Sequence, residues 1–235
     1  MRSARAALAA LCAVLGGGCW EFIEPEFAEQ DASTVLQVNA SLGERGIFNL
    51  SGILVPGLDE DGFVREVVRD TLFVFGLPVP SDSTTPAGSL IYQYSTQLSA
   101  GVAAGRFTID PPVVSGISSG PRVEWSTPRS LEPDTIRMAR GADLLIRLAY
   151  DSTQAAPRPN HQWFLELSNN VERFQISSNG PPPAQLLVPA MWIPQPRDSV
   201  VHVFFTSSQS ALVFLNDYRG AYNYTVQFDH TIVIR

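Results

Sequence analysis

The segment AYNYTVQFDHTIVIR (221–235) alternates apolar and polar side chains along its whole length. An alternation with a period of two places one set of side chains on each face of a β-strand. A slip of one residue would turn the entire apolar set toward solvent, so such a strand needs a fixed register against a core. The set expected to face the core is Tyr222, Tyr224, Val226, Phe228, His230, Ile232 and Ile234.

The chain from Ser33 onward repeats this character in short runs. Runs rich in Val, Ile, Phe, Tyr and Thr are broken by Gly, Pro, Asn, Asp and Ser about every ten residues, which is typical of an all-β protein. NDYRG (216–220) has the turn chemistry of a hairpin, whereas 63–72 fits a helix or a strand. We expect strands near 34–40, 46–55, 64–76, 89–98, 105–109, 121–126, 134–139, 143–150, 162–168, 171–177, 184–189, 199–206, 211–216 and 221–235.

Two packed antiparallel sheets are the natural way to bury so many half-apolar strands. We therefore predict an immunoglobulin-like or jelly-roll sandwich. Residues 33–235 are predicted to form one such domain; if there are two, the boundary falls in PPVVSGISSGP (111–121). About 200 residues are enough for a core without disulfides, and the two cysteines, Cys12 and Cys19, both precede this region.

The first eighteen residues have the composition of an export signal. Arg2 and Arg5 are followed by an apolar run over 6–15 and by three glycines at 16–18. A positive start, a short apolar segment and small residues are the features of a secretory signal peptide. We expect residues 1–18 to be removed.

The cysteine that follows the glycines makes this segment resemble the lipobox of bacterial lipoproteins. The resemblance implies that Cys19 is lipidated and becomes the new N-terminus; Leu11 before Cys12 does not fit the cleavage rule. Gly16 stands where the family usually has a branched apolar residue. An ordinary secreted protein and an uncleaved anchor are the alternatives.

Residues 19–32 are then a short tether between the lipid and the domain. Its extended reach is at most roughly 45 Å, so the domain would stay close to the membrane. The apolar run is too short for a membrane-spanning helix, which needs about 20 residues. The tether carries four large apolar residues that are expected to contact the bilayer interface or a membrane protein: Trp20, Phe22, Ile23 and Phe27.

The charge balance limits the partners. The chain has 16 basic and 23 acidic residues, a net charge of −7, and loss of Arg2 and Arg5 would give 14 − 23 = −9. A nucleic-acid-binding protein needs a basic surface, so we expect no nucleic acid. Anionic headgroups would not attract this chain either, and attachment is expected through the lipid or a protein.

No pattern in the chain predicts catalysis. GISSG (116–120) fits a nucleophile motif around Ser118, but that motif requires a following helix, and a strand is predicted there. Asp59-Glu60-Asp61-Gly62 (59–62) lacks the spacing of a calcium loop and is expected to be a solvated turn. We therefore predict a protein that is not an enzyme and that uses no cofactor.

The three histidines are far apart in the sequence and predict no metal site. His230 falls on the apolar face of its strand, where a core or rim histidine with a hydrogen bond is expected. His202 can meet His230 only if their strands pair. The third is His161.

The segment GPPPAQLLVPAMWIPQP (180–196) alternates prolines with large apolar residues, so it is an edge or a covering loop. Two readings are open: its large side chains form a patch that contacts a partner, or they fold back and close the sandwich. The residues concerned are Leu187, Met191, Trp192 and Ile193.

These features together predict a non-catalytic envelope protein, anchored by lipid on the periplasmic or extracellular side of a membrane. The expected role is a structural or accessory subunit that docks on a membrane protein complex. The alternative is a sandwich that binds a glycan or a peptide in a site lined by loops, for which Trp125 and Trp163 are the candidate aromatics.

Overall fold

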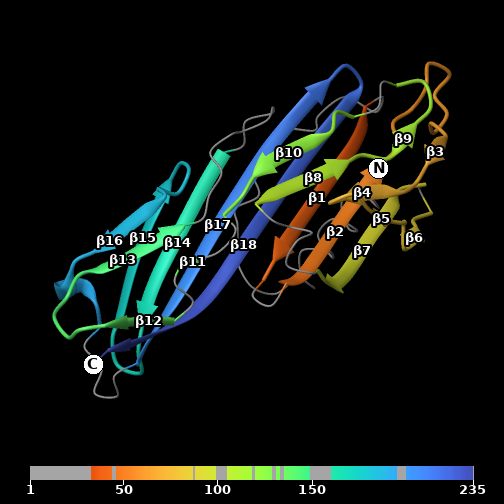
Figure 1. Ribbon diagram of the computed structural model, residues 1–235. Coiled ribbons are helices and arrows are strands. Elements are labelled where there is room, and N and C mark those ends of the chain that lie inside the picture. Colours follow the sequence, from red (N-terminus) through yellow and green to blue (C-terminus); the bar gives the residue numbers. More distant parts are fainter. Residues whose placement is uncertain are drawn as a thin grey trace. The chain divides into compact units, whose positions relative to one another are not determined.

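The computed structural model describes residues 33–43, 46–86, 88–98, 105–117, 120–128, 131–132, 135–148, 160–194 and 200–234. Figure 1 shows that β-strands make up nearly all of the regular structure in these ranges. The predicted all-β class is confirmed, with several sheets rather than one. A search of these ranges found no helix with the length and apolar character needed to cross a membrane.

The largest sheet, called sheet A, contains nine strands. Their order in space is β15-β14-β17-β18-β1-β2-β7-β6, and β12 pairs with β18 outside this path. The strands are β1 (Thr34–Leu42), β2 (Ile47–Val55), β6 (Ser83–Thr84), β7 (Leu90–Gln97), β12 (Thr135–Met138), β14 (Asn160–Ser168), β15 (Arg173–Asn179), β17 (Val200–Leu215) and β18 (Tyr218–Ile234).

Strand β18 lies inside sheet A and pairs with three other strands. One of its edges pairs with β17 in antiparallel orientation over nearly its whole length. The other edge pairs in parallel with β1 over Tyr218–Val226 and with β12 over Thr231–Ile234. These two parallel pairings depart from the predicted antiparallel arrangement, because β1 and β12 reach β18 through long connections instead of a hairpin.

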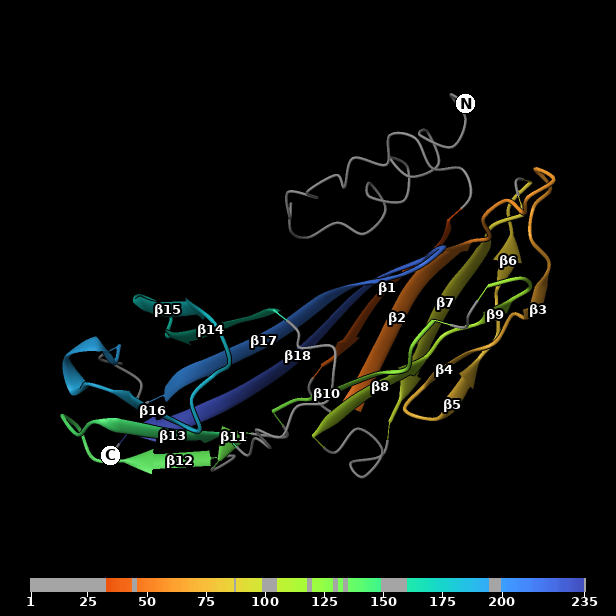
Figure 2. The ribbon, with the colours of Figure 1, turned by 90° about the horizontal axis from the view of Figure 1, so that it is seen from above.

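Three smaller sheets complete the structure. Figure 2 shows the second and third largest sheets on the same side of sheet A. One has the order β10-β8-β4-β5, another β11-β13-β16, and the last pairs β3 with β9. Their strands are β3 (Val67–Arg69), β4 (Leu72–Val74), β5 (Leu77–Val79), β8 (Arg106–Asp110), β9 (Val113–Val114), β10 (Val123–Ser126), β11 (Leu131–Glu132), β13 (Leu144–Leu148) and β16 (Gln185–Val188).

Two hydrophobic clusters lie between sheet A and these smaller sheets. The first cluster packs one half of β18 and strands β1, β2 and β7 against β4, β8 and β10. The second cluster packs Ile232 and Ile234 of the other half, with β14 and β17, against β13 and β16. Phe228 contacts both clusters. One face of the same two long strands therefore serves two separate cores.

Most predicted strands are present, but two predictions of strand continuity are wrong. The predicted strand 64–76 is two short strands, β3 and β4, which belong to different sheets. The segments 199–206 and 211–216 were predicted as two strands, but β17 runs unbroken through the polar residues between them. The predicted hairpin is confirmed: Leu215 pairs with Tyr218, and Asn216 in the turn has a φ of 46°. The ambiguous region 63–72 contains β3 and the start of β4, not a helix.

Candidate functional site

The predicted lipid and tether residues lie outside the described residues: Cys19, Trp20, Phe22, Ile23 and Phe27. The described chain starts at Ser33 and enters sheet A at Thr34. Thr34 is buried, and its backbone N–H donates to the carbonyl of Asp217 over 2.7 Å. The first described residues therefore lie beside the turn between β17 and β18.

The four large side chains predicted in the proline-rich segment differ in exposure. Leu187 is 64% exposed and Met191 is 84% exposed, and Trp192 is also exposed. Ile193, in contrast, is only 3% exposed and belongs to the second cluster. Three of the four side chains are thus available to a partner, while Ile193 folds back and closes the core.

Trp192 also has a structural role at the edge of sheet A. Its ring stacks on Phe174 of β15, with a centroid distance of 5.4 Å and an interplanar angle of 18°. The 3₁₀ helix Ala190–Trp192 is held by the carboxylate of Asp143, which accepts a hydrogen bond of 2.8 Å from the N–H of Ala190. The exposed patch therefore rests on a fixed backbone.

A second apolar surface was not predicted. Sheet A has an open face, opposite the two clusters, and no strand in the described ranges lies over it (Figure 2). Leu212 and Phe214 of β17 point to this face and are 63% and 68% exposed. Strand register places them in two rows with further apolar residues, and we call this set the apolar band: Val35, Ile53, Val55, Ile91, Leu212, Phe214 and Ala221. Two polar residues, Gln37 and Arg219, lie within the same two rows.

The apolar band lies at the end of sheet A where the chain enters it. Val35 directly follows Thr34, and the Asn216 turn directly follows β17. The sequence signal for the band is the run ALVFL (211–215), which is apolar at both odd and even positions. A strand with one solvated face would alternate instead.

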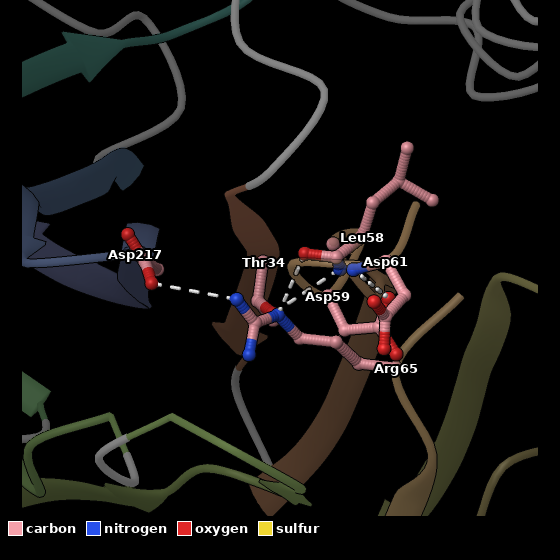
Figure 3. A network of polar contacts seen from close by, with 7 residues as sticks. Thr34, Leu58, Asp59, Asp61, Arg65 and Asp217 are labelled. Atoms are coloured by element: carbon pink, nitrogen blue, oxygen red, sulfur yellow. Dashed lines mark hydrogen bonds and ion pairs between the residues drawn. The ribbon is translucent and has the colours of Figure 1, made fainter. Parts of the chain in front are cut away.

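An ion pair ties a neighbouring loop to this end, as Figure 3 shows. The Arg65 guanidinium lies 3.4 Å from the carboxylate of Asp217, and its Nε donates to the carbonyl of Leu58 over 3.0 Å. The Arg65 side chain is largely buried, whereas Asp217 is more than half exposed. The contact joins residues 152 positions apart and fixes the loop beside the β17–β18 turn.

The acidic turn of that loop is organised by its own backbone. The Asp59 carboxylate accepts hydrogen bonds from the N–H groups of Asp61 and Phe63, at 3.1 and 2.8 Å. Gly62 has a φ of 81°, which the turn requires. No group of three or more His, Cys, Asp or Glu side chains in the described ranges is arranged to hold a metal ion.

A buried polar row separates the two clusters. Ser207 and Gln209 point to the core side of β17, between Phe205 of the second cluster and Ala211 of the first. Register places His161 opposite Gln209. The Gln209 amide nitrogen donates to the carbonyl of Ser126 over 2.6 Å and lies 3.4 Å from His161 Nδ1.

This geometry is compatible with a neutral His161. The Gln209 nitrogen is a donor, so Nδ1 of a neutral imidazole can accept from it. Burial lowers the pKa of His161, because a charged ring is poorly solvated there. Two other atoms of the row, Ser207 Oγ and Gln209 Oε1, find no hydrogen-bond partner among the described residues. The same holds for the hydroxyl oxygen of Tyr224, which lies opposite Gln209 on β18.

The remaining sequence candidates do not form a site with one another. Strands β17 and β18 do pair, but His202 lies opposite Thr231, and His230 lies opposite Val203. Residues directly opposite each other share a face, so the two imidazoles are on different faces. Ser118 lies outside the described residues, and strand β10 follows the motif.

The glycine that ends this motif has a packing role instead. A Cβ atom at Gly120 would lie 2.3 Å from the Tyr218 ring, and one at Gly220 would lie 2.5 Å from the Tyr222 ring. The hydroxyls of Tyr218 and Tyr222 are hydrogen-bonded to each other. Burial raises the pKa of both phenols, so both stay neutral.

The aromatic candidates for a ligand site are also in the core. Trp125 is completely buried in the first cluster, and Trp163 is buried in the second. Neither ring is available to a soluble ligand at an end of the domain.

Comparisons with known proteins give no family. No family model matches the chain, and no curated protein matches it. A solved structure described as "Structural insight into host cell surface retention of a 1.5-MDa bacterial ice-binding adhesin" is similar at 12% identity. The match covers 88% of this chain and 66% of that chain, with a TM-score of 0.22, a likeness that carries no argument about function.

Proposed function

We propose that the protein is a non-catalytic subunit of the cell envelope, anchored by lipid at Cys19, that docks on a membrane protein complex on the periplasmic or extracellular side. The observation that carries this proposal is the apolar band. Large exposed apolar patches on soluble proteins mark interaction sites, and the band exposes Leu212 and Phe214 with only Gln37 and Arg219 as polar neighbours in its rows. The band lies beside Thr34, where the described chain enters sheet A.

The distance to the membrane supports the same assignment. Thr34 is 34 − 19 = 15 residues from Cys19, so the band lies within about 50 Å of a lipidated Cys19 even if the tether is fully extended. The exposed side chains of the proline-rich segment, Leu187 and Met191, lie on the second cluster, beyond the other half of β18. Through Val35, the band is therefore closer along the chain to a lipidated Cys19 than the proline-rich segment is.

The layers of the domain are part of the proposal. Sheet A forms one layer, and the smaller sheets over the two clusters form the other, which supports a β-sandwich. The immunoglobulin-like or jelly-roll type stays a prediction. The alternative function, a site for a glycan or peptide, loses its predicted aromatics Trp125 and Trp163. Polar side chains on the open face of sheet A favour it instead.

A pull-down from native membranes in a gentle detergent tests the docking role. We expect a stoichiometric membrane partner with the natural protein, and its loss when Leu212→Asp and Phe214→Asp are combined. The matched control combines Leu187→Asp and Met191→Asp, which are equally exposed and should keep the partner. Recovery of the natural protein as a free monomer contradicts the proposal, and loss of the partner only in the control moves the docking site to the proline-rich segment.

The anchor is tested separately. Mass spectrometry of the N-terminal peptide should find lipid on Cys19 and no residue before it. Cys19→Ser should release the protein from the membrane fraction. An unmodified Cys19 peptide contradicts the lipid anchor, and retention of the Cys19→Ser protein assigns the attachment to the partner or to an uncleaved signal.

A further inference from the structure

The middle of the open face of sheet A carries two adjacent rows of polar side chains, each crossing six strands. Strand register aligns every row across β14, β17, β18, β1, β2 and β7. We call them the polar rows. The first is Asn160, Ser210, Asn223, Asn39, Ser51 and Gln93; the second is Gln162, Ser208, Thr225, Ser41, Asn49 and Ser95.

None of these twelve residues is charged. Asp, Glu, Lys and Arg make up 17% of the chain, so twelve positions of average composition would carry about two charges. The chain as a whole has 23 acidic and 16 basic residues, and none of them falls in these two rows. The polar rows therefore suit a ligand without charge.

Cross-strand hydrogen bonds fix part of this surface. Asn223 Nδ2 donates to Asn39 Oδ1 over 2.9 Å, and the hydroxyls of Ser208 and Thr225 lie 3.0 Å apart. In the same way Ser95 Oγ donates to Asn49 Oδ1 over 2.8 Å. Side chains held in place lose little entropy when a ligand binds. None of the twelve residues is buried, so all can be reached from the open face.

The chemistry of the rows matches a sugar hydroxyl. An amide offers donors and an acceptor, and a hydroxyl offers one donor and two acceptor lone pairs, so each can pair with a group that is itself both donor and acceptor. Six strands at about 4.8 Å span about 24 Å, which accommodates several sugar rings along one row.

An aromatic pair borders the rows on the same face. Phe164 follows Gln162 by two residues on β14, and its ring lies 6.5 Å from that of Phe204 on β17. Both rings are partly exposed. Ligand sites commonly combine aromatic surface with a few placed polar groups. From these observations we infer that the polar rows bind an uncharged polysaccharide, with the two phenylalanines at one side of the site.

This inference does not depend on docking through the apolar band. The polar rows and the band share no residue, and binding of a sugar can be measured with the purified protein in the absence of any partner. A failure of the docking experiment therefore leaves the inference untouched, and the reverse also holds.

Calorimetric titration of the full-length protein, solubilised in detergent, tests the inference. The probes are the neutral hexasaccharides of β-1,4-linked glucose, mannose and N-acetylglucosamine, with hexagalacturonate as the charged comparison. We expect at least one neutral probe to bind and the charged probe to bind at least tenfold more weakly. Gln93→Ala and Gln162→Ala, both exposed, should each weaken binding about fivefold, the value of one hydrogen bond.

The matched control is Gln175→Ala on β15, which lies on the same face outside the rows and should leave the affinity unchanged. Thermal melts of each variant confirm that the fold is kept. The inference is overturned if no neutral hexasaccharide binds, if hexagalacturonate binds equally well, or if the Gln93 and Gln162 variants bind like the natural protein. Sedimentation that shows dimers broken by the same two variants also overturns it and assigns the rows to a second copy of the chain.

Discussion

The two hydrophobic clusters share the long hairpin of β17 and β18 but differ in composition. The first cluster is rich in aromatic residues: Phe107 stacks on Tyr224 at 4.2 Å and lies 5.5 Å from Trp125. The second cluster is mostly Leu, Ile and Val, with Trp163 and Phe205 as its fully buried or nearly buried rings. Aliphatic packing has no polar group to satisfy, whereas every buried tyrosine brings a hydroxyl that needs a partner.

One pair of strands, β17 and β18, contributes side chains to both clusters. The buried polar row of Ser207, Gln209 and His161 lies on the core side of sheet A and is distinct from the polar rows of the open face. It interrupts the apolar face between the clusters, while the backbone ladder of β17 and β18 continues through it. Side-chain packing is thus divided, and backbone hydrogen bonding is not. Variants in each cluster and in the row between them separate the contribution of side-chain packing to stability from that of the continuous backbone ladder.

The largest effect is expected from Phe107→Ala in the first cluster. Loss of a buried ring and the cavity left behind should lower the free energy of unfolding by about 3–5 kcal/mol. Because the clusters share a ladder, hydrogen exchange of β14 amides in the second cluster should accelerate too. Phe214→Ala, on the open face, is the control and should change stability by less than about 0.5 kcal/mol. Unchanged protection of β14 would show that the clusters unfold independently.

A smaller loss is expected from Gly220→Ala. The new methyl group would meet the Tyr222 ring at 2.5 Å, and overpacking of this kind costs about 1–3 kcal/mol. Gly43→Ala is the matched control, since its nearest contact is 3.7 Å away. Denaturant unfolding of both proteins gives the comparison, and equal midpoints would mean that the tyrosines move aside at no cost.

Two tyrosines of the first cluster should respond oppositely to the same change. Tyr92 Oη donates to the carbonyl of Asp70 over 2.7 Å, so Tyr92→Phe should cost about 0.5–1.5 kcal/mol. Tyr224 Oη is buried without a partner among the described residues, so Tyr224→Phe should be neutral or stabilising. Equal losses in the two variants would show that Tyr224 has a partner after all.

The smallest effect should depend on pH and originate between the clusters. Burial lowers the pKa of His161, so the unfolded chain takes up a proton at a higher pH than the folded protein does. Stability is then complete above the ordinary histidine pKa of about 6.5 and declines as the pH falls below it. Chemical unfolding between pH 7.5 and 5.5 should show a smaller decline for His161→Gln than for the natural protein. The exposed His202→Gln is the control, and an identical decline in all three proteins would exclude His161 as the source.

Local patterns predicted the strands well and their continuity less well. The alternation of β18 predicted its core face correctly from Tyr222 to Ile234, although Phe228 and His230 are only partly buried where the clusters meet. The break predicted within β17 was wrong because Thr206-Ser207-Ser208-Gln209-Ser210 (206–210) has the composition of a turn. Pairing with β14 and β18 on both sides outweighs that local preference.

The surfaces were harder to predict than the strands. The proline-rich segment was identified from its composition, but only packing separates the exposed Leu187 and Met191 from the buried Ile193. The polar rows contain residues from Asn39 to Thr225, and strand order alone brings them together. Parallel pairing of β1 with β18 is a contact between distant segments, and no local pattern in either strand predicts it.

The central position of β18 has a consequence for how the chain is made. Among the described strands it is the last to leave the ribosome, yet it lies between β17 and β1. Until β18 has been synthesised, β1 has an unpaired edge, and such edges promote aggregation. Thr34 must then pair with Tyr218, which is distant in the sequence. Closing such long loops slows folding, so sheet A can be completed only after the last of its described strands has been synthesised.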